Sequence, residues 1–426
     1  MPIGVRALRR LLLWRQGLLQ ADAVDAGRPW REELRGREGA LDAIRRLECV
    51  QVDPVSAVAP NQHLVLAARV AGYRAADLEA LYPAGRVFEY ASQARCILPV
   101  EDLPTYAVVM EHFWRAALAS PHTDRVALDR IVESLTRSPD QTARQLGTPS
   151  ESWSAGYMPA GDTPRPDGIP PLGQLLLGGR VVVSRRRGIE KAYDVPERRL
   201  PPELWRQVEA VRGLPGLAEA LAEFRRRLRW KYYRALRVFD LSDFRFGWSA
   251  TPPAERRRLA EEDKRQGLLR EVRVDGVRRP YFILEEDAEP LPALERAEVE
   301  PCLTFVPPLD NLLWSRRRLE DLFGFSYSWE VYTPKEKRAF GYYAMPIVEG
   351  DALIGRIDPR LEKGSSTMRI ARLALEPGVE PDRARVRRLR AGLDAFARAH
   401  GAAAWTVERA EPEVLLPRLG RAAGRG

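Results

Sequence analysis

The first hundred residues alternate short amphipathic helices with short extended segments. Apolar residues recur at helical spacing in residues 5–19, 38–47, 61–70 and 75–81. An extended segment at 49–53 ends at Pro54, and residues 95–99 have the composition of a strand. A small helical domain with a sheet at its edge is typical of a winged helix.

A second unit begins near Pro121. Helical spacing predicts helices over 125–136 and 140–146, and a polar stretch rich in Pro and Gly follows at 148–171. After residues 173–177, two extended runs at 181–184 and 189–195 flank Arg185, Arg186, Arg187 and Gly188. The pattern predicts a hairpin whose tip carries three arginines.

A third unit repeats this order. Helices are expected at 217–238 and 254–266, before two alternating runs at 268–274 and 277–284. Asp275-Gly276 between these runs predicts a two-residue hairpin turn, because both turn residues must take positive φ. Helices followed by a two-stranded wing thus occur three times, without a residue-level repeat of fixed period.

From Thr304 onward the pattern changes to strands. We expect strands at 326–332, 339–348 and 352–358, followed by a helix at 383–399 and a frayed tail at 418–426. The predicted fold class is therefore α+β, with three winged-helix units and a C-terminal β-domain. The expected boundaries are 1–120, 121–200, 201–290 and 291–426.

Charge and composition narrow the class of protein. The 426 residues carry a formal net charge of +9, which favours a polyanionic partner, although arginine so outnumbers lysine that a GC-rich genome is a second explanation. The three cysteines and four histidines are dispersed, so we expect no metal site and a reducing, cytoplasmic setting. The apolar patch at 11–14 is too short to cross a membrane.

Gln51 and Asp53 form a polar pair in the extended segment. Residues two apart in a strand point to the same side, so both can face one cavity while Val52 anchors the segment in the core. Taken alone, the pair is better explained as a polar turn in which Asp53 caps the segment at Pro54.

Four sequence motifs favour the catalytic interpretation of Gln51 and Asp53 over the structural one. They are Cys-Val-Gln-Val-Asp at 49–53, Phe-Glu-Tyr-Ala at 88–91, Leu-Asp-Asn-Leu-Leu-Trp at 309–314 followed by three arginines, and Phe-Gly-Tyr-Tyr-Ala-Met-Pro at 340–346. Together they resemble the YcaQ-like and AlkZ-like winged-helix DNA glycosylases, which unhook interstrand crosslinks. The resemblance covers almost the whole chain.

The resemblance implies three tandem winged helices and a β-barrel-like C-terminal domain, C-shaped around DNA. It also implies a catalytic motif of Gln, an apolar residue, then Gln or Asp, which here is Gln51 and Asp53. The aspartate places the chain nearer the YcaQ-like branch. Gln93 stands where the family commonly has His, which leaves a role for that imidazole open.

The expected chemistry is hydrolysis of an N-glycosidic bond. A purine alkylated at N7 or N3 is already a good leaving group, so the enzyme has to stabilise an oxocarbenium-like sugar and position water. We assign to Asp53 the negative charge that stabilises the sugar, and to Gln51 the orientation of the water. A bifunctional enzyme needs an amine nucleophile, and no lysine occurs in the first 190 residues. We therefore expect a monofunctional enzyme without cofactor.

The expected partner is double-stranded DNA with alkylated bases or crosslinks, bound by a monomer without membrane association. Arginines and one lysine of the predicted wings and of the third motif are the candidate phosphate contacts, and ordinary solvated surface is the alternative. They are Arg185, Arg186, Arg187, Lys191, Arg278, Arg279, Arg316 and Arg317, with Arg318 adjacent.

Two other readings remain open. A non-catalytic winged-helix regulator would bind DNA but has no reason to present Gln51 and Asp53 to it. A scaffold in a repair or resistance pathway would bind DNA without base release. Glu89 and Tyr90 are either partners of the catalytic pair or structural, and the aromatics at 239, 244, 246 and 248 either stack on bases or form core.

Overall fold

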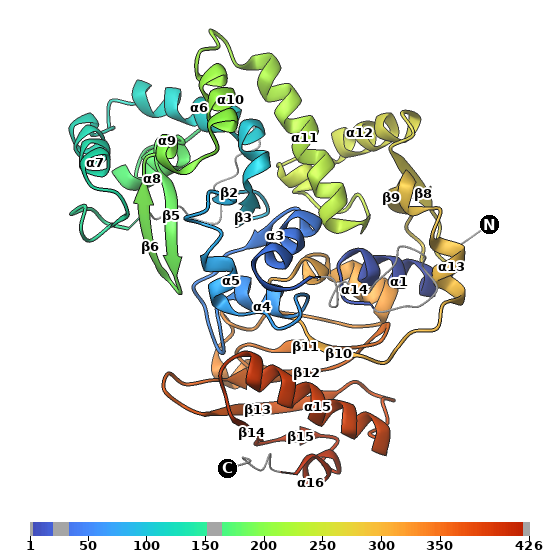
Figure 1. Cartoon of the computed structure of the whole chain (residues 1–426). Coiled ribbons are helices and arrows are strands. Elements are labelled where there is room, and N and C mark those ends of the chain that lie inside the picture. Colours follow the sequence, from blue (N-terminus) through green and yellow to red (C-terminus); the bar gives the residue numbers. More distant parts are fainter. Residues whose placement is uncertain (1–2, 20–33, 151–163, 421–426) are drawn as a thin grey trace.

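The computed structural model describes residues 3–19, 34–150 and 164–420. Three stretches of the chain each contain helices followed by a three-stranded antiparallel sheet (Figure 1), and we call them segments I (36–99), II (125–194) and III (218–284). In each sheet the order is first strand, third strand, second strand. A short strand therefore lies beside the last strand of a hairpin in all three.

The elements of the three segments are as follows. Segment I contains α3 (Gly36–Leu47), β1 (Val50–Gln51), α4 (Asn61–Ala67), α5 (Ala75–Glu79), β2 (Val87–Ala91) and β3 (Arg95–Pro99). Segment II contains α7 (Arg125–Arg137), β4 (Gln141–Thr142), α8 (Pro171–Leu177), β5 (Val182–Arg187) and β6 (Glu190–Asp194). Segment III contains α11 (Ala218–Leu236), β7 (Val238–Phe239), α12 (Pro253–Arg265), β8 (Leu269–Val272) and β9 (Tyr281–Leu284).

Helices connect the segments. The long helix α6 (Leu103–Ala119) follows segment I and contacts α10 (Pro202–Arg212), which comes after the short α9 (Pro196–Arg199). The N-terminal helix α1 (Val5–Arg15) packs on α13 (Leu291–Arg296) and α14 (Arg316–Phe323). It shares a buried apolar cluster with segment III, and Arg69 of segment I donates to the carbonyl of Gln16 at its C-terminal end.

The C-terminal part is an open, curled sheet. Its strands run in the order β10 (Leu303–Phe305), β11 (Met345–Glu349), β12 (Ala352–Arg360), β13 (Thr367–Leu375), β14 (Ala404–Val407), and β15 (Ala410–Glu411) also pairs with β13. Irregular register in β11–β12 and β12–β13 marks bulges, which bend sheets. Helix α15 (Arg383–Ala399) links two parallel strands and packs on the sheet, and α16 (Leu415–Leu419) ends the described chain.

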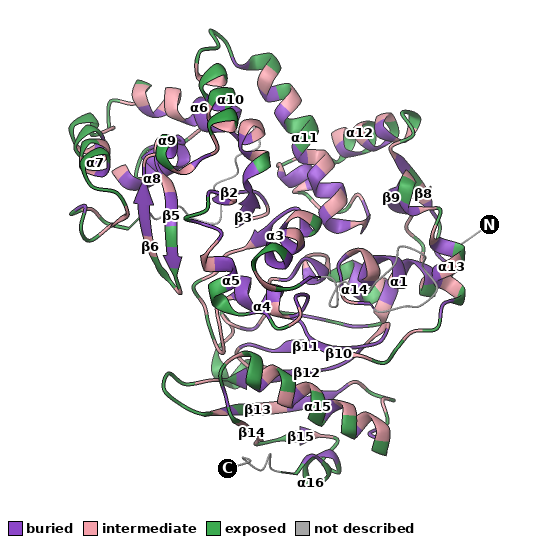
Figure 2. Cartoon of the chain, in the orientation of Figure 1, coloured by how far each residue is buried: buried purple, intermediate pink, exposed green. Residues whose placement is uncertain are grey.

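Burial follows this arrangement. Figure 2 shows β11 and β12 as buried, whereas α7 exposes its outer face. Residues of α3, α6 and the sheet of segment I take part in two separate apolar clusters, one shared with segment II and one with segment III. Segment I is therefore central to the packing of the chain.

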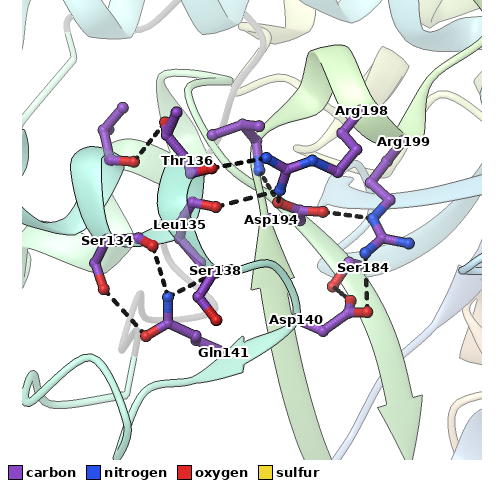
Figure 3. Close-up of polar contacts among 12 residues, drawn as sticks. Ser134, Leu135, Thr136, Ser138, Asp140, Gln141, Ser184, Asp194, Arg198 and Arg199 are labelled. Atoms are coloured by element: carbon purple, nitrogen blue, oxygen red, sulfur yellow. Dashed lines mark hydrogen bonds and ion pairs between the residues drawn. The ribbon is translucent and has the colours of Figure 1, made fainter.

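The expected helix at 140–146 is wrong. Asp140 takes a positive φ of 57°, and Gln141 and Thr142 form β4, which pairs with β6. Polar contacts hold this reversal (Figure 3): Ser184 donates to Asp140 at 2.6 Å, and Arg199 forms ion pairs with Asp140 and Asp194. Short polar side chains that bond nearby groups compete with helix formation.

The hairpin of segment III forms without the expected tight turn. Val272 pairs with Tyr281, so residues 273–280 make a longer loop, in which Gly276 but not Asp275 has positive φ. The cause is an N-terminal contact, because Val274 forms a bridge with Ile3 instead of extending the hairpin. The preference of Asp-Gly for a two-residue turn was therefore overridden by backbone pairing with Ile3, which is distant in sequence.

The expected strands at 326–332 and 339–344 are loops, and β11 begins only at Met345. In the second of these stretches, carboxylates accept hydrogen bonds from the backbone donors that a sheet would use. Glu330 accepts hydrogen bonds from the backbone of residues 339, 340 and 341, and Asp358 accepts from Tyr342 and Tyr343. The strand β13 was not predicted. Of the expected tail at 418–426, residues 418 and 419 belong to α16, and 421–426 lie outside the described residues, as does part of 148–171.

Buried polar groups around the third motif connect these parts, and we call Arg69, Asp310, Asn311 and Arg318 the Asp310 joint. Arg69 and Asp310 form a bidentate ion pair at 2.6 and 2.9 Å, with both side chains fully buried. Asn311 donates to the carbonyl of Leu47 at the end of α3. The joint thus fixes the chain before α14 to segment I.

Arg318 extends the joint to segment III. Its guanidinium is fully buried and donates to the carbonyls of Leu236 and Val238 at 2.7 and 2.9 Å. It also donates to the carbonyls of Asn311 and Leu312. Arg318 is therefore not a phosphate contact, because its hydrogen bonds are used inside the protein.

We predict that Asp310→Ala destabilises the protein by about 3–5 kcal/mol, because it leaves the buried Arg69 charge unpaired. Urea denaturation measures this change. The matched control is Glu38→Ala, which removes exposed ion pairs with Arg37 and Arg86 and should change stability by less than about 1 kcal/mol. Equal effects of the two variants would contradict the role of the joint.

Candidate active site

Gln51 is the last residue of the short strand β1, and the backbone on both sides of it is held. Gln51 pairs with Cys96 of β3, and the Val52 amide donates to the carbonyl of Arg95 at 2.8 Å. The side chain of Asn61 donates to the Gln51 carbonyl, also at 2.8 Å. The side-chain amide of Gln51 makes no hydrogen bond with the described part of the chain, so it is available to a ligand or water.

Strand alternation divides the neighbouring side chains between two cores. Cys49 and Cys96 belong to the cluster shared with segment III, whereas Val50 lies in the cluster shared with segment II. Val52 packs against that second cluster, as expected for an anchoring residue. By the same alternation, Gln51 belongs on the face of Cys49 and Cys96.

Asp53 follows in a half-buried position. Its Oδ1 accepts a hydrogen bond from the Val55 amide at 2.8 Å, and Oδ2 makes none within the described residues. Burial raises the pKa of Asp53 above its ordinary value, and the Val55 hydrogen bond only partly opposes this. The interpretation of Asp53 as the cap of a polar turn is therefore correct for the local geometry. Its second carboxylate oxygen is still available for chemistry.

The residues after Asp53 rest on the C-terminal sheet. Val55 and Ala57 pack against the cluster that contains Tyr343, and the Leu361 amide donates to the Ala57 carbonyl at 2.8 Å. Tyr343 is buried, its hydroxyl has no hydrogen-bond partner in the described structure, and burial together with the Asp53 carboxylate raises its pKa. An unpartnered phenol thus lies near the candidate carboxylate.

Glu48, just before β1, is a buried anchor. It ends α3 with a positive φ of 67° and accepts hydrogen bonds from Lys231 and Arg234 of α11, the first at 2.6 Å. Burial works to raise the pKa of Glu48, but the two cations outweigh it and hold the pKa low. Lys231 also pairs with Asp102 at 2.6 Å, and these carboxylates hold its pKa above the ordinary value despite burial.

Glu89 anchors the other side of segment I. It is buried and accepts from Arg186 at 2.8 Å, from Arg95 at 2.8 Å and from Tyr82 at 2.9 Å. Burial opposes ionisation, yet Arg186 and Arg95 hold the pKa of Glu89 far below its usual range. Tyr90 donates to the carbonyl of Leu177 at 2.8 Å. Glu89 and Tyr90 of the second motif therefore attach segment I to segment II.

The predicted phosphate contacts divide into surface and internal residues. Arg185, Arg187, Arg278, Arg316 and Arg317 are exposed, whereas Lys191 is half-buried. Arg186 points inward to Glu89, so the prediction that it contacts phosphate is wrong for this conformation. The physical reason is strand alternation, because Arg185 and Arg187 lie on the opposite face of β5.

Arg279 is partly engaged as well. Its guanidinium lies 3.3 Å from Asp321 and 3.7 Å from Asp240. The three-arginine run also does not sit at the hairpin tip, because β5 extends to Arg187 and the turn falls at Gly188 and Ile189.

Other residues of interest have structural positions. His63 is buried and bonds to Tyr73 at 2.7 Å, and burial lowers its pKa to about 4. Phe239, Phe246 and Trp248 are core, whereas Phe244 is exposed. Within the described residues, no group of three or more His, Cys, Asp or Glu side chains is arranged to hold a metal.

Sequence reasoning gave no role to Asn61, Glu48, Lys231 or Tyr343. Two signals were present: Glu48 directly precedes the first motif, and Tyr343 lies within the fourth. Asn61 and Lys231 gave no signal, because their partners are ten and 183 residues away in sequence.

The fold can be compared with those of known proteins. The structure is similar to that of the Streptomyces sahachiroi DNA glycosylase AlkZ, with a TM-score of 0.55 over 96% of this chain and 100% of that one, at 17% identity. The likeness shows a shared α+β fold.

The sequence itself gives the family. Residues 44–403 match the family described as DNA glycosylase AlkZ-like, and the chain belongs to this family. It is therefore a DNA glycosylase, which favours the enzyme over the regulator and the scaffold. No helix in the described ranges is long and apolar enough to cross a membrane.

We predict that Asp53→Asn leaves the melting temperature at pH 7 unchanged or higher. Burial raises the pKa of Asp53 in the folded state, so folding loses stability as pH rises through that pKa and the ionised group appears. Asparagine keeps an acceptor for Val55 without the charge. Thermal melts at pH 7 and at acidic pH, where the difference should shrink, measure this.

The contrasting control is Asp310→Asn, which removes the charge that pairs with Arg69 and should lower the melting temperature. A marked loss of stability in Asp53→Asn at pH 7 would show that Asp53 is a structural residue.

Proposed function

We propose that the protein is a monofunctional glycosylase that hydrolyses the N-glycosidic bond of N7- or N3-alkylated purines in duplex DNA and unhooks interstrand crosslinks, acting as a monomer. The observation that carries the proposal is the half-buried Asp53 carboxylate, with one oxygen fixed by Val55 and the other unbonded, two residues from an unengaged Gln51 amide. Family membership supports the class of reaction.

The proposed reaction needs little acid catalysis. As the bond from C1′ to the alkylated purine breaks, its electron pair neutralises the positive charge of the base, and positive charge develops on the sugar. The Asp53 carboxylate stabilises that charge. Gln51 orients a water whose oxygen bonds to C1′, and the water's proton passes to Asp53 or solvent. The products are a free base and an abasic site.

The environment of Lys231 supports monofunctional chemistry. A nucleophilic lysine needs a depressed pKa so that its amine is neutral. Lys231 reaches the segment that carries Gln51 only through Glu48, and its two carboxylate partners raise its pKa instead. Its ammonium is thus held charged by the same contacts that anchor the strand.

We also propose that segments I, II and III are three winged helices. Their shared order of helix, short strand, helix and hairpin, with the sheet order first–third–second, supports this reading. The proposed units remain those at 1–120, 121–200 and 201–290, followed by a C-terminal domain at 291–426. Helix α1, at the start of the first proposed unit, packs on α13 and α14 and so connects the first unit to the last.

Base release tests the proposal directly. Duplex DNA carrying N7-methylguanine is incubated with the protein, and alkali converts abasic sites into strand breaks. We expect Asp53→Asn to reduce the rate by about 100-fold or more, the scale of a lost electrostatic group in an active site. Because burial raises the pKa of Asp53, the acidic limb of the pH–rate profile should lie above the pKa of an ordinary aspartate.

The control for that experiment is Asp129→Asn on the exposed face of α7, which should keep the wild-type rate. Near-normal release by Asp53→Asn would remove the proposed mechanism. The same assay on a duplex crosslinked through N7 of guanine tests unhooking separately.

Salt dependence tests the proposed DNA contacts. Each phosphate contact contributes about 0.9 to the slope of log affinity against log salt. We predict that the double change Arg185→Ala, Arg187→Ala lowers the slope by roughly 2 in duplex-binding titrations. Arg226→Ala is the matched control, because that exposed arginine pairs with Glu223, and it should leave the slope unchanged. An unchanged slope in the double variant would contradict contacts on this hairpin.

A further inference from the structure

A hollow of about 470 Å³ opens between segment III and the start of α14. We call it the Trp248 hollow. Its volume falls within the range of small-molecule sites. The residues that matter for its chemistry are Gln93, Phe244, Arg245, Trp248, Arg316 and Arg317. They come from the β2–β3 turn, the stretch after β7 and the N-terminus of α14, which the Asp310 joint holds together.

The walls of the hollow suit a flat ring. Trp248 contacts Trp314 edge to face with ring centroids 6.3 Å apart, and both line the hollow. Phe244 also lines it and is 68% exposed, although its neighbours Phe246 and Trp248 are buried. A large aromatic side chain left open to solvent beside a cavity is available to stack on a ligand.

Two exposed cations lie at the edge of the hollow. Arg316 and Arg317 are exposed and form no ion pair with the described residues. Of the acids that line the hollow, Asp240 lies 3.7 Å from Arg279, whereas Asp243 accepts hydrogen bonds from Tyr232 and from the Arg245 backbone and forms no ion pair with the described residues. The hollow therefore offers aromatic surface inside and two cations at its edge.

Buried donors in the same walls are unused. The indole Nε1 of Trp248 and the Nε of Arg245 have no hydrogen-bond partner in the described structure, although both are buried. Another nitrogen of Arg245 donates to the carbonyl of Gln93, which fixes the guanidinium at the β2–β3 turn. Unsatisfied buried donors are rare in proteins, and these two lie behind the solvent-facing wall of the hollow.

The hollow lies beside the strand of the candidate active site. Gln51 pairs with Cys96, three residues after Gln93, and Cys96 shares a buried cluster with Trp248. Strand alternation places Gln51 on the Cys96 side of the sheet. A nucleotide held in the hollow is thus on the same face as the residue proposed to orient water.

We propose that the Trp248 hollow binds the alkylated purine nucleotide after it has turned out of the duplex. The base stacks on Phe244 and on the accessible part of Trp314, and Arg316 and Arg317 hold the adjoining phosphates. This rests on the proposed function for the identity of the substrate, and it adds that the base leaves the stack before its bond is cut.

The first test measures binding without chemistry. The probe is 7-methylguanosine 5′-monophosphate, titrated into the full-length protein by calorimetry. We expect Phe244→Ala to weaken binding by roughly tenfold, the scale of one lost stacking contact, and Phe244→Tyr to retain it. Arg316→Ala should weaken the nucleotide but not 7-methylguanosine. The control is Val126→Ala, an exposed apolar residue of α7.

The outcomes of that titration are distinct. No binding by the wild-type protein, or equal binding by all Phe244 variants, would overturn the proposal. Binding of inorganic phosphate without binding of the nucleoside would also overturn it, because it would leave an anion site without base recognition.

A second measurement separates this proposal from the proposed function. Base release from the N7-methylguanine duplex should fall roughly tenfold in Phe244→Ala. Wild-type release by that variant, with release still dependent on Asp53, would overturn the hollow and keep the glycosylase mechanism. Nucleotide binding that depends on Phe244, together with no base release by the wild-type protein, would keep the hollow and overturn the mechanism.

Discussion

The Arg69–Asp310 ion pair is the contact on which the relative placement of the parts depends. Both groups are fully buried, and their bidentate geometry accepts little change in distance or angle. A buried charge left without its partner is strongly destabilising, so the pair admits one arrangement of segment I against the chain before α14. Asn311 and Arg318 add hydrogen bonds to backbone carbonyls of α3 and segment III.

Two further buried carboxylates, Glu48 and Glu89, attach segment I to segments III and II through ion pairs. Glu48 binds Lys231 and Arg234 of segment III, and Glu89 binds Arg186 of segment II. The Gln51–Asp53 stretch lies between these anchors. Its surroundings therefore come from three parts of the chain, and its own hydrogen bonds to Asn61 and Val55 determine only the local turn. The proposed role of this pair in positioning water requires such support, because small displacements reduce catalysis.

The four motifs have different physical roles. The first contains the proposed chemistry, the second joins segments I and II through Glu89 and Tyr90, and the third forms the Asp310 joint. The fourth supplies Tyr343 near Asp53. The arginine-rich composition divides in the same way. Arg69, Arg186 and Arg318 are internal, so the formal charge of +9 does not measure the positive surface offered to DNA.

The sequence alone determined the elements that depend on local periodicity. Helices such as α7, α11 and α15, the α+β class and the extended segment before Pro54 were predicted correctly, because apolar spacing and Pro or Gly signals act within a few residues. The hairpins of segments II and III were predicted at the right place in the chain but with the wrong turns. Gln51 and Asp53 were singled out from their motif, and their catalytic role stays a prediction.

Tertiary structure decided what depends on distant partners. A bridge from Ile3 to Val274 took the place of the expected tight turn at 275–276. Carboxylates took the backbone donors of the strand expected at 339–344, and Arg186 is buried against Glu89. The residues that support Gln51 and Asp53, and those that form the Trp248 hollow, likewise come from separate segments. No local pattern contains these contacts, because burial and ion pairing depend on which chain segments meet, and that is decided by packing over the whole molecule.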